Sequence, residues 1–155
     1  MSYLVYLIAI CIFTLLDQLS KKQIVDYLKL GEKIEIIKNF FNITHVRNYG
    51  AGFSILQNAR LFLSLVSIIA IGVLAYLLVT TKKKNTLTTI SYLMVISGAL
   101  GNLLDRLRQG YVVDFLDFKI FGWDYPVFNV ADIFITVGCF LLILVSLKGE
   151  KDAKN

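Results

Sequence analysis

Two aspartates, Asp114 and Asp132, are the side chains of this sequence best placed to do chemistry. Asp132 lies within a long apolar run and, counted from Val127, is about 7–8 Å along a helix that rises 1.5 Å per residue. An ionisable side chain at that depth in an apolar segment is costly and is a functional candidate by default. Asp114 follows another apolar run, in a connection that returns to the same face. Two neighbouring carboxylates cannot easily both ionise, so they share a proton.

A carboxylate pair that shares one proton can activate water, as in aspartic peptidases. One carboxylate takes a proton from the water while the other polarises the carbonyl group that is attacked. The alternative interpretation is structural, because backbone N–H groups at the start of a helix also stabilise an aspartate. The spacing alone leaves both interpretations open.

A polar stripe precedes Asp114. Asn102, Asp105 and Arg106 follow one another at i, i+3 and i+4, which places them on one face of a helix. Gly98 and Gly101 come just before them, and small residues let membrane helices pack closely. The stripe either orients a site or forms a structural ion pair.

Two further segments carry weaker signals. Asp17 and Lys21 form an i,i+4 pair in the favoured order, which either supports a site or stabilises a helix end. The segment 48–53 begins with Asn48 and contains Gly50, and its glycines allow unusual backbone geometry or the close approach of a ligand. An ordinary loop explains the same pattern.

The elements that position these residues are predicted to be membrane helices. The chain has 155 residues, of which 57% are hydrophobic and 17% charged, whereas a soluble domain is roughly half apolar and a quarter charged. Disordered and ordinary soluble classes are therefore excluded. A helix crosses a bilayer with about 20 mostly apolar residues. We predict one polytopic membrane domain, mainly α, with an extracytoplasmic insert at 21–59 and four transmembrane helices at about 3–20, 60–81, 86–106 and 126–147.

Alternating spans bring one end of each helix, and both long connections, to the same face. The polar residues gather there, so any chemistry is predicted at that face. Within the insert, residues 22–30 predict a short amphipathic helix lying in the interface, ended by Gly31. Residues 34–37 and 40–46 are rich in Ile, Phe, Thr and Val and predict strands. The insert should form a small β-rich segment on the membrane surface.

Charge indicates the partners and the orientation. The net charge is +5, and the charges lie between apolar runs, which favours membrane lipids over nucleic acid as partners. The short loop at 82–84 is all lysine and the C-terminal tail is also basic, so both are predicted to be cytoplasmic. Most basic residues lie at the other face together with most acids, but long folded segments count less in this rule.

The few cysteines and the single histidine restrict the chemistry further. Cys11 and Cys139 lie inside apolar runs and form no C-x-x-C pattern, so a disulfide framework is excluded. His45 has no cluster of further metal-ligating residues in the sequence, and we predict no protein-held metal.

Five short motifs occur in order at the predicted polar face: D-x-x-[ST]-K at 17–21, N-x-G-x-x-F at 48–53, G-A-x-G-N-x-x-D-R at 98–106, G-x-V-x-D-F at 110–115 and F-N-x-A-D at 128–132. Together they make nearly the whole chain resemble the lipoprotein signal peptidase (signal peptidase II) family. Departures are small: Ser97 stands where many members have glycine, and Trp123 lies two residues from Tyr125 rather than next to Pro126.

The resemblance implies an aspartic endopeptidase with Asp114 and Asp132 as the catalytic dyad. The residues implied to line the site or orient the substrate are Asn48, Gly50, Asn102, Arg106, Asn129 and Ala131. The residues implied to give structural support are Asp17, Lys21 and Asp105. The implied reaction removes the signal peptide from diacylglyceryl-modified prolipoproteins just before the modified cysteine, without metal or cofactor.

The resemblance also implies a bacterial cytoplasmic membrane protein with both termini inside and its site near the outer leaflet. The alternatives are a small proton-coupled transporter and a noncatalytic assembly factor. Transporters often show inverted repeats and midplane sites, whereas here the acids cluster at one end and no repeat is visible.

Overall fold

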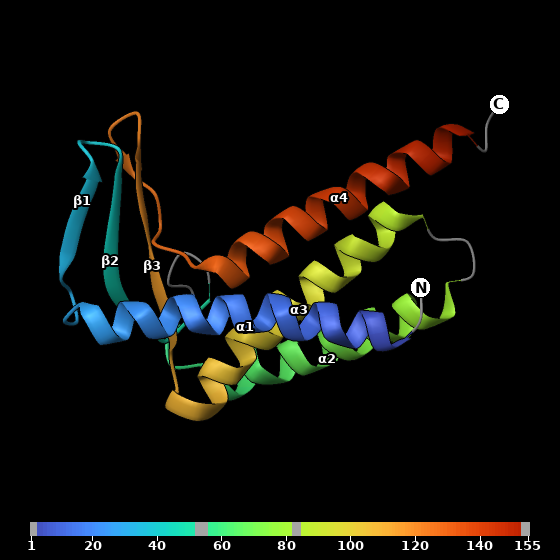
Figure 1. Cartoon of the computed structure of the whole chain (residues 1–155), viewed down its shortest axis with the longest axis horizontal. Coiled ribbons are helices and arrows are strands. Elements are labelled where there is room, and N and C mark those ends of the chain that lie inside the picture. The colour runs from blue at the N-terminus through green and yellow to red at the C-terminus, as the bar shows by residue number, and fades with distance from the viewer. Residues whose placement is uncertain (1–2, 52–55, 82–84, 153–155) are drawn as a thin grey trace.

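The computed structural model of the chain describes residues 3–51, 56–81 and 85–152, which form four helices and four strands (Figure 1). In chain order the elements are α1 (Tyr3–Tyr27), β1 (Lys33–Ile37), β2 (Phe41–Asn48), α2 (Arg60–Thr80), α3 (Thr86–Gln109), β3 (Val112–Ile120), β4 (Trp123–Asp124) and α4 (Val130–Asp152). The lysine loop at 82–84 and residues 52–55, which include Gly52 and Phe53, lie outside the described residues.

Four helices are long and apolar enough to cross a membrane, which confirms the predicted membrane fold. Helix α3 is central: 61% of its most apolar window is buried, against 11–17% for the other three helices. It packs against α1, α2 and α4. The other helices expose most of their apolar side chains, which suits a lipid surrounding rather than water.

Helices α3 and α4 approach closely because glycines face the contact. A Cβ atom at Gly138 would lie 2.6 Å from Val95 Cγ2 and 2.9 Å from the Ser91 carbonyl oxygen, and one at Gly98 would collide with the Ala131 carbonyl oxygen. Small residues at these positions therefore allow backbone-to-backbone packing in a setting where the hydrophobic effect does not drive helices together.

Helix α1 is longer than predicted. The sequence predicted a span over 3–20 and a separate interfacial helix over 22–30, but the structure has one continuous helix to Tyr27. No glycine or proline interrupts it before Gly31, whose φ of 80° follows the helix end as expected. At 1.5 Å per residue its 25 residues span about 37 Å, more than the roughly 30 Å of a bilayer core. Its last turns therefore project beyond the other helices (Figure 1).

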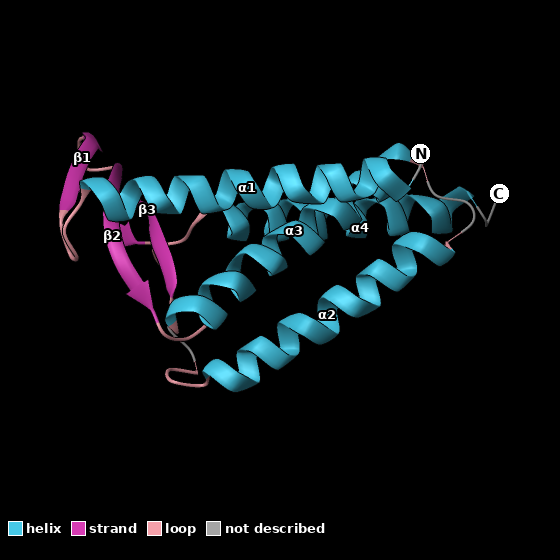
Figure 2. Cartoon of the chain, turned by 60° about the horizontal axis from the view of Figure 1, so that its bottom comes forward, coloured by secondary structure: helices cyan, strands magenta, loops and turns pink. Residues whose placement is uncertain are grey.

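The strands form one antiparallel sheet in the order β1-β2-β3-β4. Strands β1 and β2 confirm the prediction, whereas β3 and β4 were not predicted, because residues 107–124 were interpreted only as a connection. The sheet lies at one end of the helices (Figure 2).

Helix α4 begins later than predicted, at Val130 rather than near residue 126. The residues before it are extended and bonded to β3: the Phe115 and Leu116 N–H groups donate to the Phe128 carbonyl oxygen (3.0 and 2.8 Å), and the Tyr125 N–H donates to the Phe118 carbonyl oxygen (2.9 Å). This extended stretch joins the sheet to the membrane helix.

Candidate active site

Asp114 is held by the middle of the sheet. It pairs in register with Val46 of β2, and its side chain is almost fully buried, with 2% of the residue exposed. Its two carboxylate oxygens accept N–H groups from the side-chain amides of Asn129 (2.7 Å) and Asn48 (2.8 Å). Burial, and next the charge of Asp132, raise the pKa of Asp114 to about 7. Asp114 can therefore hold a proton near neutral pH.

Asp132 lies in the first turn of α4 and forms a reciprocal cap with Asn129. The Asp132 N–H donates to Asn129 Oδ1 (3.0 Å), and the Asn129 N–H donates to Asp132 Oδ2 (3.1 Å), which is the geometry of a capping box. The predicted depth of this residue was wrong, because α4 begins at Val130 and Asp132 is its third residue. The structural interpretation, in which backbone N–H groups at a helix start stabilise the aspartate, therefore agrees with the hydrogen bond from the Asn129 N–H to Asp132.

Two asparagine side chains connect the two aspartates. Asn102 Nδ2 donates to Asp132 Oδ1 (2.8 Å), while Asn129 Nδ2 donates both to Asp114 Oδ1 and to Asn102 Oδ1 (3.2 Å). Each of the four carboxylate oxygens thus accepts an N–H from an uncharged amide. The amides fix the orientation of both acids without supplying a positive charge.

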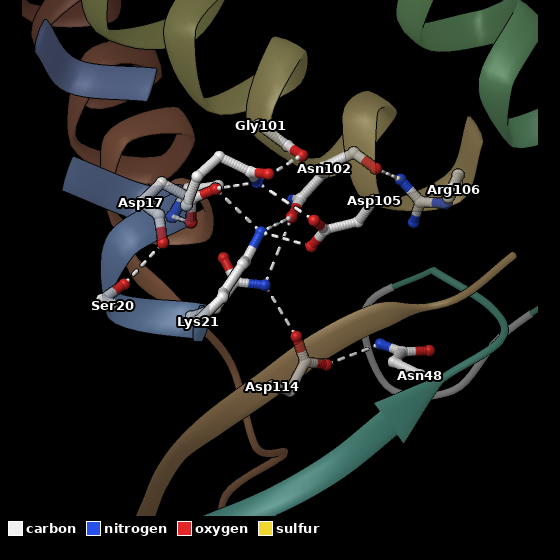
Figure 3. Close-up of polar contacts among 12 residues, drawn as sticks. Asp17, Ser20, Lys21, Asn48, Gly101, Asn102, Asp105, Arg106 and Asp114 are labelled. Carbon is white, nitrogen blue, oxygen red and sulfur yellow. Dashed lines mark hydrogen bonds and ion pairs between the residues drawn. The ribbon is translucent and has the colours of Figure 1, made fainter. Parts of the chain in front are cut away.

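A buried ionic cluster lies behind the amides (Figure 3). Lys21 Nζ contacts Asp17 Oδ2 (2.9 Å), Asp105 Oδ2 (2.8 Å) and Asn102 Oδ1 (3.0 Å). All three charged side chains are nearly inaccessible. Because Lys21 donates to Asn102 Oδ1, the amide of Asn102 must turn its NH2 group toward Asp132.

Asp17 ties α1 to the start of α4. Its Oδ1 accepts the Ala131 N–H at 2.9 Å, at a helix N-terminus where negative charge is favoured. A Cβ atom at Gly101 would collide with Asp17 Oδ2, so glycine is needed there for this approach. Sequence reasoning missed Gln18, whose Nε2 donates to Asp17, to the Gly101 carbonyl oxygen and to Asp105 at 3.0–3.2 Å. Its position next to Asp17, in the polar segment that follows the first apolar run, was the available signal.

Arg106 holds the loop after β2. Its Nη2 donates to the Gly50 carbonyl oxygen at 2.9 Å, and Nη1 lies 3.5 Å from the Asn102 carbonyl oxygen. The Gly50 N–H also donates to Asn48 Oδ1 (2.9 Å). Gly50 and Ala131 thus contribute backbone atoms, while the other predicted site residues contribute side chains.

A cavity of about 760 Å³ opens beside the two aspartates. Its polar lining includes Asn48, Asn102, Arg106, Asp114, Asp132 and Thr136. Aromatic side chains from the sheet form one apolar wall, and the first turns of α4 form another, through residues that include Phe118, Phe128, Tyr125, Ile133 and Val137. Asp17, Lys21, Asp105, Asn129 and Ala131 are not among the lining residues and lie behind it.

The arrangement places two carboxylates of unequal surroundings in an apolar cavity. A concave site with mainly apolar walls and a few convergent polar groups is typical of a binding site. Among the described residues no group of three or more His, Cys, Asp or Glu side chains is placed to hold a metal ion.

Fold and site together define a polytopic membrane protein whose carboxylates lie in a cavity at one end of its helices. The model of the family described as signal peptidase (SPase) II matches residues 8–148. The chain belongs to the signal peptidase II family and is a peptidase of the cell membrane that serves lipoprotein processing. A transporter or an assembly factor is thereby set aside.

Relatives and solved structures agree with this assignment. A protein of Staphylococcus aureus named lipoprotein signal peptidase is 38% identical to this chain, over 96% of it and 91% of the relative. Two solved structures described as bacterial membrane enzymes superpose with TM-scores of 0.90 and 0.84 at 35% and 36% identity. The first alignment covers 97% of this chain and 92% of the other, and the second covers 94% of each.

Proposed function

We propose that this chain cleaves lipid-modified prolipoproteins just before the lipidated cysteine, with Asp114 and Asp132 as the catalytic pair. The observation that carries the proposal is the amide network, which holds both acids at one cavity through uncharged N–H groups. The family membership supports the substrate class, and the apolar walls suit a substrate that is part membrane helix and part lipid.

In the proposed reaction Asp132 starts ionised and Asp114 starts protonated. A raised pKa favours the proton on Asp114, and the N-terminus of α4 favours the charge on Asp132. Asp132 takes a proton from water as the water oxygen bonds to the scissile carbonyl carbon, and Asp114 gives its proton to the carbonyl oxygen. In the second step the carbonyl re-forms, returning a proton to Asp114, and the C–N bond breaks as Asp132 protonates the leaving amine. The products are a carboxyl group on the signal peptide and a free amino group on the cysteine.

Three asparagines and an arginine have positioning roles in this proposal. Asn48 and Asn129 hold the Asp114 carboxyl group, and Asn102 holds that of Asp132. Arg106, through the Gly50 carbonyl oxygen, keeps Gly50 and Ala51 beside the cavity, where their backbone can contact the substrate backbone.

Cleavage of a lipidated precursor by purified protein tests the pair. Asp114→Asn and Asp132→Asn should each lower kcat by at least about 10²–10⁴-fold, the usual contribution of general acid–base catalysis. Asp124→Asn is the matched control, because this exposed aspartate at the far end of the same connection should leave kcat unchanged. A chelator should have no effect. Near-normal cleavage by both dyad variants, or loss of cleavage on metal removal, would overturn the assignment.

We also propose that both termini are cytoplasmic and that the site lies near the outer leaflet. Four spans place both termini on one side, and the lysine loop at 82–84 favours the cytoplasm. In a variant whose Cys11 and Cys139 are replaced by serine, single cysteines at Lys33 and Lys83 should react with an impermeant thiol reagent from opposite sides. Labelling of both from outside intact cells would contradict this orientation.

A further inference from the structure

The turn between β3 and β4 exposes large aromatic side chains. Phe121 is 100% exposed and Trp123 is 82% exposed. Turns of this kind in a sheet facing water usually carry Asn, Asp or Gly. Most of the surface of both aromatic side chains is therefore left uncovered by the described residues.

The backbone of this turn adopts a conformation that phenylalanine rarely takes. Phe121 has a φ of 49° and Gly122 a φ of 84°, both in the left-handed region. Positive φ is common for Gly and Asn but is an outlier for a bulky residue. Because the Phe121 side chain is fully exposed, no contact within the described protein offsets this conformation.

The position of the turn indicates lipid as the partner. In Figure 1 the orange hairpin projects across the direction of the helices, on the side of the bundle where α4 lies. Beyond the cavity, α4 exposes the apolar side chains of Phe140, Ile143 and Leu144, as expected of a surface in contact with acyl chains. The hairpin therefore reaches out over the bilayer that surrounds α4.

The cavity wall leads to the same turn. Phe118 stacks on Phe128 (ring centroids 5.7 Å apart), and Tyr125 meets Phe128 edge-on (5.8 Å). These rings and Ile120 line the cavity, and Ile120 is directly followed by Phe121. Beside the turn Lys119 and Asp124 form a pair at 3.6 Å, so the tip presents aromatic surface flanked by balanced charges. This composition is typical of the membrane–water interface.

We propose that the 120–123 turn is an interfacial anchor: Phe121 and Trp123 insert into the head-group region of the leaflet beside α4. The anchor holds the aromatic wall of the cavity against the bilayer surface, where an apolar substrate can pass from lipid into the cavity. Insertion of the turn does not depend on which residues are catalytic, so its failure would leave the dyad assignment standing.

Trp123 is the only tryptophan of the chain, which allows a direct test by fluorescence. The full chain is reconstituted in phosphatidylcholine nanodiscs with and without lipids brominated on the acyl chains, which quench nearby tryptophan. We expect strong quenching of Trp123, a blue-shifted emission maximum and weak quenching by aqueous acrylamide.

The matched control moves the tryptophan to Tyr27, in a Trp123→Phe, Tyr27→Trp variant. Tyr27 is 84% exposed and is the last residue of α1, a helix whose C-terminal turns project beyond the other helices in Figure 1. Emission from that position should be red-shifted, open to acrylamide and little affected by brominated lipid. Equal behaviour at the two positions, or Trp123 emission insensitive to brominated lipid, would overturn the proposal.

A second variant separates insertion from folding. Phe121→Asn suits the positive φ, so the chain should fold at least as well, as measured by its thermal unfolding. The same variant should weaken quenching of Trp123 by brominated lipid, because the turn loses one of its two inserted rings. Unchanged quenching in Phe121→Asn would refute the part assigned to Phe121.

Discussion

Replacing Lys21 by methionine should destabilise the fold far more than the same change at its neighbour Lys22. The Lys21 side chain is 4% exposed and lies 2.9 Å from Asp17 and 2.8 Å from Asp105. Its removal leaves two carboxylates buried without a counter-ion, and breaking a buried ion pair in this way costs about 3–5 kcal/mol. The Lys22 side chain is 68% exposed and pairs with Asp26 at the surface, where solvent screens the interaction.

Thermal unfolding in detergent, followed by circular dichroism, measures the difference. A loss of this size corresponds to a fall in Tm of roughly 6–20 °C for a chain of this length, whereas Lys22→Met should stay close to the wild type. Combining Lys21→Met with Asp17→Asn and Asp105→Asn removes the uncompensated charge, so the triple variant should recover part of the loss. Equal Tm values for the two single lysine variants would refute the reasoning.

Two further predictions concern the acid and the glycine contact. Because burial raises the pKa of Asp114 from its ordinary 3.8 to about 7, kcat/KM should fall as pH rises through about 7 and the proton is lost. Between these two pKa values the folded chain keeps a proton that the unfolded chain has released. The contribution of Asp114 to the free energy of unfolding is therefore full below pH 3.8 and is lost as pH rises to about 7. The free energy of unfolding should depend less on pH in Asp114→Asn than in the wild type. Gly101→Ala should push Asp17 from its place and lower stability by about 1–3 kcal/mol, whereas Gly72→Ala, with open space around it, should raise stability slightly, and thermal unfolding of the two variants checks this.

The membrane fold could be predicted because its signal is local. Each span is an uninterrupted apolar run, and α2 and α3 differ from their predicted bounds by only a few residues. The predicted strands at 34–37 and 40–46 were also visible, because β-branched and aromatic residues cluster there. Four alternating spans then place the polar ends on one face without any knowledge of contacts.

The unpredicted parts depend on long-range pairing. An apolar run such as 125–128 can be helical or extended, and periodicity alone does not distinguish the two. Here hydrogen bonds to β3 hold it extended. Helix α4 therefore starts later, and Asp132 lies in its first turn rather than about 7–8 Å along the helix as predicted. Asn102 and Asn129 could be picked out from their motifs. That their amides connect the two aspartates could not be predicted, because this connection depends on contacts between distant segments.

The order of charges around the site explains why amides stand between Lys21 and the acids. A lysine bonded directly to either carboxylate would favour the ionised form of both, and a pair that is fully ionised has no proton to give to a carbonyl oxygen. Lys21 is instead held by Asp17 and Asp105, and its remaining hydrogen bond goes to the side-chain carbonyl oxygen of Asn102 rather than to either acid of the pair. Its charge orients that amide, and with it Asp132, while burial keeps the proton on Asp114. The ionic cluster thus fixes the orientation of the acids without forming an ion pair with either of them. The repulsion between the two carboxylates, which makes them share a proton, is therefore kept.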